Sequence, residues 1–427
     1  MKFIVVSLYM FKKPSSFFVR LFLIAHLFCV LSLVDSKAQE QFGFVLPEGK
    51  KRVEIPFQQY SNLIVIPVTI NGFLTLKFIL DTGAETSILT EKLFGDVLEL
   101  NYVREIDLQA PGIEDSLRAF VAAGINFSLP GGIEGKNHNL LVLKDDYLEL
   151  NKNLGDEIYG IMGYDVFSRF VVSIDYDEQM LTLHDPNYFR PRRSETPLPM
   201  QIVDTKPYVK VKVGQKDKFD SLKLMVDTGA SHALLLDLNK SNKIQMPRKT
   251  VSTRLGKGLA GEIPGQMGRV TSCEMGGLRF EKVLSSFPLE GAYTQGIKRG
   301  SRHGTLGAEI LTRMKVTFDY HNELMYIRKG ADFKKPFEFN MSGIILNAEG
   351  KKLDSLVINH VIPNSPGSHS GLRVGDVILR INNMNLSNST ITDLNAVLRK
   401  KPGLKMVVII SRGEQKIKKR FRLKRLI

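Results

Sequence analysis

The chain has 427 residues, of which 43% are hydrophobic and 24% are charged. This composition excludes wholesale disorder, and the length exceeds what one hydrophobic core usually serves, so two or three domains are expected. The formal net charge of +15 brings polyanions into consideration, namely nucleic acid, anionic lipid or a cell-envelope polymer.

The N-terminal region has the pattern of an export signal. Basic residues precede an apolar run from Leu21 to Val34, and small residues stand at the minus-three and minus-one positions before Gln39. We therefore expect residues 1–38 to be a signal peptide and the mature protein to be exported to the periplasm, the cell envelope or the medium. An uncleaved anchor is the alternative. Met1 and Met10 are both candidate starts.

The central part of the chain contains an internal repeat. The stretch "LKFILDTGAETSIL", which begins at Leu76, returns as "LKLMVDTGASHALL", which begins at Leu222. Two further matches follow in the same order: "YGIMGYDVF" with "HGTLGAEIL", and "FVVSIDYDEQMLTL" with "MKVTFDYHNELMYI". Three collinear matches indicate two homologous units.

Both units predict β structure. Each consists of short segments rich in Val, Ile, Leu, Phe and Thr, separated by Gly, Pro or Asn, without long helical periodicity. We expect a mostly β fold with lobe one at residues 43–190 and lobe two at residues 197–330. A connector rich in proline and charge separates them.

The repeat places one carboxylate at the end of an apolar strand in each lobe, Asp81 and Asp227. A lone Asp-Thr-Gly is a weak signal because Asp and Gly are favoured in turns. Two copies in equivalent positions are more informative, since a pseudo-two-fold axis would bring the two strand ends together. Carboxylates in such contact cannot both ionise cheaply, so they would share a proton and supply a base and an acid at one site.

These motifs resemble the aspartic peptidases of the retropepsin-like and pepsin-like superfamily. The resemblance implies two acid-protease-like β-barrel lobes that share an active-site cleft, with Asp81 and Asp227 as the catalytic pair. It gives supporting roles to six further residues: Thr82, Gly83, Gly163, Thr228, Gly229 and Gly307. Alanine follows both Asp-Thr-Gly motifs, as in retroviral-type members, whereas pepsin-like members usually have serine or threonine there.

The reaction implied is hydrolysis of a peptide bond by a water activated between the two aspartates. No cofactor and no metal are expected. Family members close the site with a β-hairpin flap, and two glycine-containing stretches are candidates for it, Leu108 to Leu117 and Arg254 to Gln266. Either could be the flap, and both could be plain surface loops.

The last part of the chain, residues 337–427, resembles a PDZ domain. Ser365-Pro366, Gly371-Leu372 and the stretch "VGDVI" stand where the family has its "SPA…AGL…GDVI" pattern. Such domains add an extended peptide to a sheet edge and hold its C-terminal carboxylate in a loop. The groove residues implied are Gly343, Ile344, Ile345, Leu394 and Leu398. The alternative is a module that only packs against the lobes.

The sequence therefore predicts an exported, monomeric aspartic endopeptidase that acts on peptides or proteins, with a C-terminal peptide as a further ligand of the PDZ domain. The alternative is a non-catalytic peptide-binding envelope protein with protease-like lobes. Seven basic residues between Lys416 and Arg425 favour weak association with an anionic envelope surface, or simply form a solvated edge strand. No nucleic acid is expected, because no aromatic stacking platform accompanies the basic tail.

Overall fold

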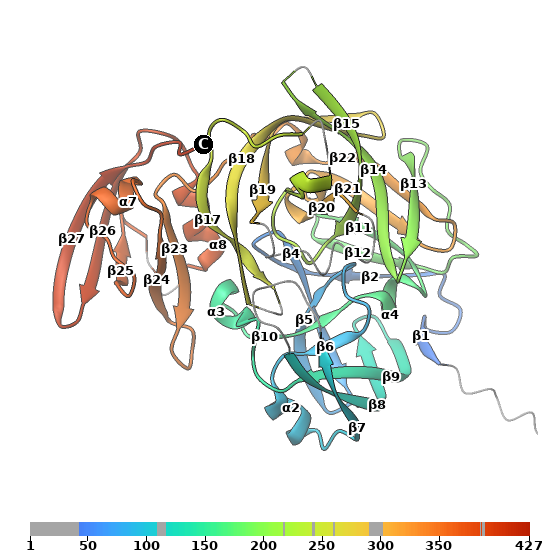
Figure 1. The fold of residues 1–427 in the computed structure, drawn as a ribbon. Helices are drawn as coiled ribbons and strands as arrows, with labels where there is room; N and C mark the ends of the chain where they lie inside the picture. The colour runs from blue at the N-terminus through green and yellow to red at the C-terminus, as the bar shows by residue number, and fades with distance from the viewer. Residues whose placement is uncertain are drawn as a thin grey trace, which may run out of the picture. The chain divides into compact units, whose positions relative to one another are not determined.

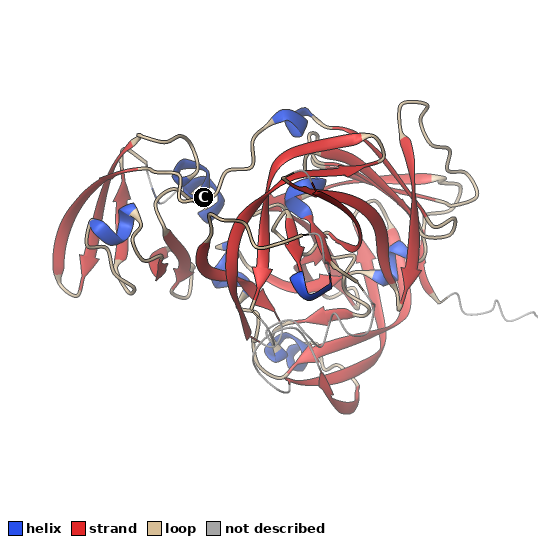
Figure 2. Ribbon diagram, turned by 45° about the horizontal axis from the view of Figure 1, so that its top comes forward, coloured by secondary structure: helices blue, strands red, loops and turns tan. Residues whose placement is uncertain are grey.

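A computed structural model describes residues 42–108, 117–216, 218–240, 244–258, 261–289, 302–384, 386 and 389–427. The expected signal peptide, residues 1–38, lies outside them. In the described residues strands dominate and helices are short (Figure 2), so the expected mostly β fold is confirmed. No helix in this part of the chain is long and apolar enough to cross a membrane.

Lobe one is built around one sheet with the strand order β1-β9-β6-β10-β5-β4-β8-β7, and β3 pairs with β4. Its strands are β1 (Gly43–Val45), β2 (Arg52–Pro56), β3 (Gln58–Tyr60), β4 (Leu63–Ile70), β5 (Leu74–Leu80), β6 (Ser87–Leu89), β7 (Tyr102–Leu108), β8 (Leu117–Leu129), β9 (Ile133–Leu143), β10 (Ile158–Met162), β11 (Val171–Asp175) and β12 (Met180–His184). Its helices are α2 (Lys92–Val97), α3 (Leu150–Leu154) and α4 (Tyr164–Phe167).

Lobe two repeats this plan, and its sheet continues into β21, β22, β11, β12 and β2. Its strands are β13 (Thr196–Val203), β14 (Lys206–Gln215), β15 (Lys218–Asp227), β16 (Leu234–Leu236), β17 (Val251–Gly258), β18 (Gly261–Met275), β19 (Leu278–Pro288), β20 (Gly304–Gly307), β21 (Met314–Asp319) and β22 (Leu324–Lys329). Its helical segments are η1 (Leu238–Lys240) and α6 (Ala308–Leu311), and η2 (Ala331–Lys334) follows.

The pairing of β11 with β21 marks a pseudo-two-fold axis between the lobes. Ser173 lies opposite Thr317 in this antiparallel pair, and the two residues are equivalent positions of the repeat. Their hydroxyl groups are 2.8 Å apart. In the repeat, Val172 is equivalent to Val316 and Ile174 to Phe318. In the strand pair Val172 lies opposite Phe318 and Ile174 opposite Val316, as a two-fold axis requires. The internal repeat of the sequence is thus a two-fold repeat in space.

Apolar strands bury both faces where they approach the axis. In lobe one, Phe78, Ile79 and Leu80 of β5 are all buried, and so are Leu224, Met225 and Val226 of β15 in lobe two; consecutive residues point to opposite faces of a strand. The parallel neighbour is β10 for the first strand and β20 for the second. Each buried strand therefore fixes the position of the aspartate at its end, Asp81 or Asp227, beside the axis.

The third domain has its own sheet, with the order β23-β24-β25-β26-β27. Its elements are β23 (Ile344–Glu349), β24 (Ser355–Val361), α7 (Pro366–His369), β25 (Val377–Ile381), α8 (Ile391–Leu398), β26 (Lys405–Arg412) and β27 (Gln415–Arg422). A capping box between Thr390 and Asp393 begins α8. The domain has a separate hydrophobic core, but Phe337 and Ile427 at its two ends belong to the core of the lobes.

Candidate active site

Asp81 and Asp227 lie where the two equivalent strands end. Asp81 comes directly after β5, and its backbone N–H donates to the carbonyl of Met162 at 2.8 Å. Asp227 is the last residue of β15 and pairs in parallel register with Gly307 of β20. Both side chains are half-buried. The ends of two parallel strand pairs thus hold the carboxyl groups.

The two threonines cross-link the loops reciprocally. The Thr82 hydroxyl donates to the carbonyl of Val226 at 2.8 Å and accepts the N–H of Thr228 at 3.0 Å. The Thr228 hydroxyl donates to the carbonyl of Leu80 at 2.8 Å and accepts the N–H of Thr82 at 3.0 Å. Both threonines are buried. Each hydroxyl thus donates one hydrogen bond and accepts one across the axis, and the four bonds together fix the separation of the loops.

The glycines after the threonines bring backbone N–H groups to the carboxylates. Gly83 donates to Oδ1 of Asp81 at 2.6 Å, and Gly229 donates to Oδ1 of Asp227 at 2.9 Å. Gly229 also donates a hydrogen bond to Asp81. A Cβ at position 229 would lie 2.3 Å from Cγ of Asp81, which no side chain can tolerate. The close approach of the two lobes therefore requires glycine at this position.

Gly163 and Gly307 fill equivalent places behind the loops. A Cβ at Gly163 would lie 2.3 Å from the carbonyl oxygen of Asp81, and a Cβ at Gly307 would lie 2.2 Å from that of His232. Each glycine is the residue before a short helix, α4 or α6. These two positions let a backbone segment pack directly on each aspartate loop.

The electrostatics of the pair differ from those of isolated carboxylates. The carboxyl groups of Asp81 and Asp227 lie close together, since a Cβ at Gly83 would be 3.1 Å from an oxygen of the first and 3.2 Å from an oxygen of the second. Burial raises the pKa of Asp81, although the N–H of Gly83 opposes the rise. Burial and then the charge of Asp81 raise the pKa of Asp227 further above its usual range. The pair therefore holds one proton between two oxygens, and Asp227 is the favoured carrier.

Sequence reasoning missed the hairpin turns that reach across to the opposite aspartate loop. The amide of Asn62 in lobe one donates to the carbonyl of Ser231 at 2.9 Å. The ammonium of Lys206 in lobe two lies 3.7 Å from Glu85, and its charge lowers the pKa of Asp81 against the effect of burial. Asn62 lies in the β3–β4 turn, and Lys206 directly follows the equivalent β13–β14 turn, so extending the repeat toward its N-terminal side could have pointed to this pair of turns.

The second flap candidate, Arg254 to Gln266, forms a hairpin of β17 and β18. This hairpin extends to lobe one, where the ammonium of Lys257 lies 2.5 Å from the carboxylate of Glu149. Residues 259 and 260 at its tip lie outside the described residues. The first candidate, Leu108 to Leu117, joins β7 and β8, and its residues 109–116 also lie outside them.

The predicted groove residues of the third domain are less accessible than expected. Ile344 of β23 and both leucines of α8, Leu394 and Leu398, are 0% exposed and belong to the domain core. Ile345 is half-buried, and Gly343 is buried with a positive φ of 76°. The loop and helix thus occupy the expected places, but their side chains offer little free surface.

Two protein-family models match the chain. A model described as aspartyl protease matches residues 66–166 and again 209–310, and the model of the PDZ domain matches residues 333–410. A search of curated proteins finds no match. The resemblances stated from the motifs are confirmed, and the chain carries two aspartyl protease domains followed by a C-terminal PDZ domain.

Proposed function

We propose that this protein is an aspartic endopeptidase whose catalytic pair is Asp81 and Asp227. The observation that carries the proposal is the meeting of the two carboxyl groups at one point, where a Cβ at Gly83 would lie 3.1 Å from Oδ1 of Asp81 and 3.2 Å from Oδ2 of Asp227, on loops that Thr82 and Thr228 cross-link. A structural Asp-Thr-Gly turn would need neither the reciprocal cross-link nor two half-exposed carboxyls in contact. Both aspartates lie in one chain, so a monomer suffices.

In the proposed mechanism the ionised carboxylate takes a proton from water, and the protonated carboxyl donates its proton to the oxygen of the scissile carbonyl. The water oxygen bonds to the carbonyl carbon and gives a tetrahedral diol. The diol then collapses, the C–N bond breaks, and the leaving nitrogen receives a proton. The greater rise in the pKa of Asp227 favours Asp81 as the base and Asp227 as the acid in the first step.

The direct test incubates the purified mature protein with a diverse peptide library across a range of pH. We expect internal peptide bonds to be cut, and a statine-type inhibitor, which presents a hydroxyl in place of the diol, to suppress cleavage. Binding of the inhibitor without any hydrolysis would favour the non-catalytic alternative. Absence of both would remove the proposal.

The PDZ domain adds peptide binding, and we propose that it positions protein substrates through their C-termini. Removing the whole domain is a poor test, because Phe337 and Ile427 pack in the core of the lobes. A better test compares one protein substrate with a free and with a blocked C-terminus. We expect blocking to lower kcat/KM for the protein and to leave the cleavage of short internal peptides unchanged.

We further propose that the protein is exported and that its last strand contacts an anionic envelope surface. The exposed residues Lys416, Lys418, Arg420 and Arg422 alternate along β27 and so share one face of it. N-terminal sequencing of the exported protein should begin at Gln39. Cosedimentation with anionic vesicles, but not with neutral ones, should be lost at moderate salt.

A further inference from the structure

The groove of the PDZ domain lies between β23 and α8, and the chain itself fills the end where a ligand carboxylate would bind. The Asn340 side-chain oxygen accepts the backbone N–H groups of Ser342 and Gly343 at 2.9 and 3.1 Å, and the hydroxyl of Ser342 at 2.6 Å. The Asn340 amide donates back to the carbonyl of Ile344 at 2.6 Å. The loop amides are thus already satisfied by an internal oxygen.

Lobe one covers the other end of the groove. Helix α3 lies against β23 (Figure 1). The helix ends at Gly155, where a Cβ would lie 3.1 Å from Cγ1 of Ile391, the first residue of α8. Nearby, the N–H of Ser61 donates to the hydroxyl of Thr392 at 3.3 Å. An extended peptide that pairs with β23 would meet α3 at this end.

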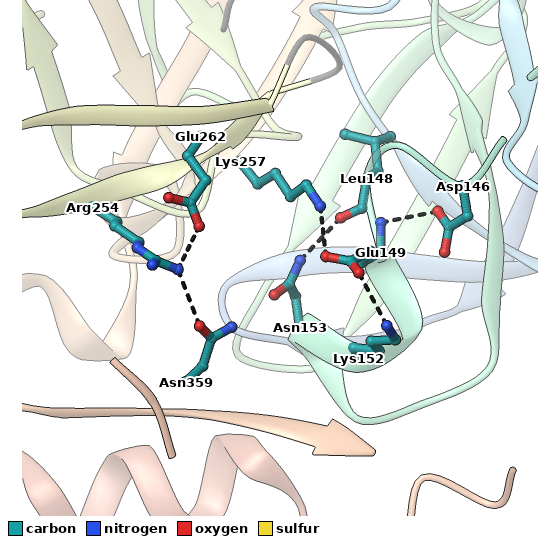
Figure 3. Close-up of polar contacts among 9 residues, drawn as sticks. All are labelled: Asp146, Leu148, Glu149, Lys152, Asn153, Arg254, Lys257, Glu262 and Asn359. Carbon is teal, nitrogen blue, oxygen red and sulfur yellow. Dashed lines mark hydrogen bonds and ion pairs between the residues drawn. The ribbon is translucent and has the colours of Figure 1, made fainter. Parts of the chain in front are cut away.

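The same segment of lobe one anchors the β17–β18 hairpin (Figure 3). One oxygen of Glu149, the residue before α3, lies 3.0 Å from the ammonium of Lys152, and the other lies 2.5 Å from that of Lys257. Partial burial alone would raise the pKa of Glu149, but hydrogen bonds from the two lysines lower it. The carboxylate is therefore ionised when it binds the hairpin.

The hairpin has a second anchor on the PDZ domain itself. The guanidinium of Arg254 in β17 donates to the side-chain oxygen of Asn359 in β24 at 3.0 Å, and it also pairs with Glu262 across the hairpin (Figure 3). The hairpin therefore touches both the helix that covers the groove and the domain that contains it.

We propose that a peptide with a free C-terminal carboxylate and an apolar last side chain competes with Asn340 for the loop amides and with α3 for β23, and that its binding releases the β17–β18 hairpin from lobe one. The proposal rests on the proposed peptidase function in one respect, because release is expected to open access to Asp81 and Asp227. The two events are linked thermodynamically. If docked α3 lowers the affinity of the PDZ domain for the peptide, bound peptide weakens the docking of α3 by the same factor and so favours the released hairpin.

The first experiment measures hydrolysis of a short fluorogenic peptide by the mature chain. The added probe is a heptapeptide library that ends in Val, Leu or Phe, and the same library with amidated C-termini is the control. We expect the carboxylate form to raise kcat/KM severalfold and the amidated form to have little effect. Carboxylate peptides that bind by fluorescence anisotropy without changing the rate, or that do not bind, would overturn the proposal.

A variant tests the anchor directly. Lys257→Gln removes the partner of Glu149 and should raise the rate without added peptide about two- to fivefold, since partly exposed ion pairs have effects of this size. Added peptide should then activate the variant less than the wild type. The matched control is Arg279→Gln, which removes two partly exposed ion pairs, with Glu274 and Glu281, at the start of β19 in lobe two and should behave as the wild type. Equal rates for both variants would contradict the coupling.

Hydrogen exchange separates this inference from the peptidase proposal. In the Asp81→Asn/Asp227→Asn variant, saturating carboxylate peptide should slow exchange in β23 and accelerate it in α3 and β17. If the wild type cuts peptides but α3 exchange does not change, the coupling is wrong and the peptidase proposal stands. If the exchange changes while no peptide is cut, the peptidase proposal is wrong and the coupling stands.

Discussion

The two lobes hold their aspartates by the same backbone plan and surround them differently. In both, a buried strand ends at Asp-Thr-Gly-Ala beside a parallel partner, and the threonine contacts are reciprocal. In the surroundings, the β3–β4 turn of lobe one offers the neutral amide of Asn62, whereas the cation Lys206 directly follows the equivalent turn of lobe two. The pKa of Asp227 is raised more than that of Asp81, by burial and by the charge of its partner. Symmetry of the backbone brings the carboxyls together, and asymmetry of the side chains makes their pKa values differ, which in the proposed mechanism would distinguish base from acid.

The largest expected effect is loss of either carboxyl. Asp81→Asn and Asp227→Asn should each lower kcat/KM about 10²- to 10⁴-fold, the usual contribution of a positioned acid or base. Initial rates on one peptide substrate measure this. Full activity in either variant would contradict a shared pair.

The same two variants should raise stability at neutral pH. A carboxyl whose pKa is raised in the folded state binds more protons there than in the unfolded state. Its contribution is fully present below the unfolded pKa and is lost as the pH rises through the folded pKa. Asparagine cannot ionise, so the variant does not lose this stability as the pH rises. Its thermal midpoint should therefore be higher than that of the wild type at pH 7 and nearly the same at pH 3. A fall at pH 7 would mean that the carboxyls stabilise the fold rather than serve chemistry.

The two glycines after the threonines should respond unequally to substitution. A Cβ at Gly229 would lie 2.3 Å from Cγ of Asp81, whereas a Cβ at Gly83 would lie 3.1 Å from the nearest carboxylate oxygen. Gly229→Ala must displace Asp81 and should lower kcat/KM about 10²-fold, because small misplacements of a catalytic group have effects of that order. Gly83→Ala should remain within about tenfold of the wild type. Equal losses would show that the two loops are equally crowded.

The threonines should respond equally. Thr82→Val and Thr228→Val each leave one buried carbonyl and one buried N–H without a partner. Each should lower the free energy of unfolding by about 2 to 4 kcal/mol, whereas serine, which keeps the hydroxyl, should cost less than about 1 kcal/mol. Urea unfolding measures both. A large difference between the two valine variants would break the two-fold description of the cross-link.

The fold and the aspartate pair could be predicted because their signals are local and repeated. Asp-Thr-Gly-Ala follows an apolar strand twice, and the later glycine motifs recur at nearly the same spacing. This pattern predicts where the two strands end and that the two ends meet at an axis. The surroundings could not be predicted in this way. Glu149 and Lys257 lie in different lobes, and their contact depends on where a hairpin tip meets a short helix.

The PDZ groove shows the same limit. The motif residues correctly indicate the domain, and Leu394 and Leu398 belong to one hydrophobic core with residues of β23. Their full burial, however, arises from tertiary packing. Asn340 precedes the loop by two residues, and its side chain could equally have pointed to solvent. The motif identifies the loop and strand of the domain. That Asn340 binds the loop amides and that α3 lies against β23 can be seen only in the folded structure.

The smallest expected effect concerns the alanines that follow the two Asp-Thr-Gly motifs. The side chains of Ala84 and Ala230 have no donor for the carboxylate of the neighbouring aspartate, and burial raises the pKa of both carboxyls. The form with one shared proton should therefore persist toward neutral pH and give a bell-shaped profile well above the strongly acidic range. Ala84→Ser and Ala230→Ser each add a donor that stabilises the charged form, so the acidic limb should move down by about one pH unit.

The two serine variants should differ in size, because their surroundings differ. Ala84 is 9% exposed and packs in an apolar cluster, whereas Ala230 is half-exposed. A hydroxyl at position 84, shielded from water, can donate to little besides the carboxylate, and the hydrogen bond is stronger in that low-dielectric setting. Water competes for the hydroxyl at position 230. The pH profile of kcat/KM should therefore shift more for Ala84→Ser. A larger shift for Ala230→Ser would mean that the base is more accessible from lobe two, and an unmoved acidic limb in both variants would refute the role given to these positions.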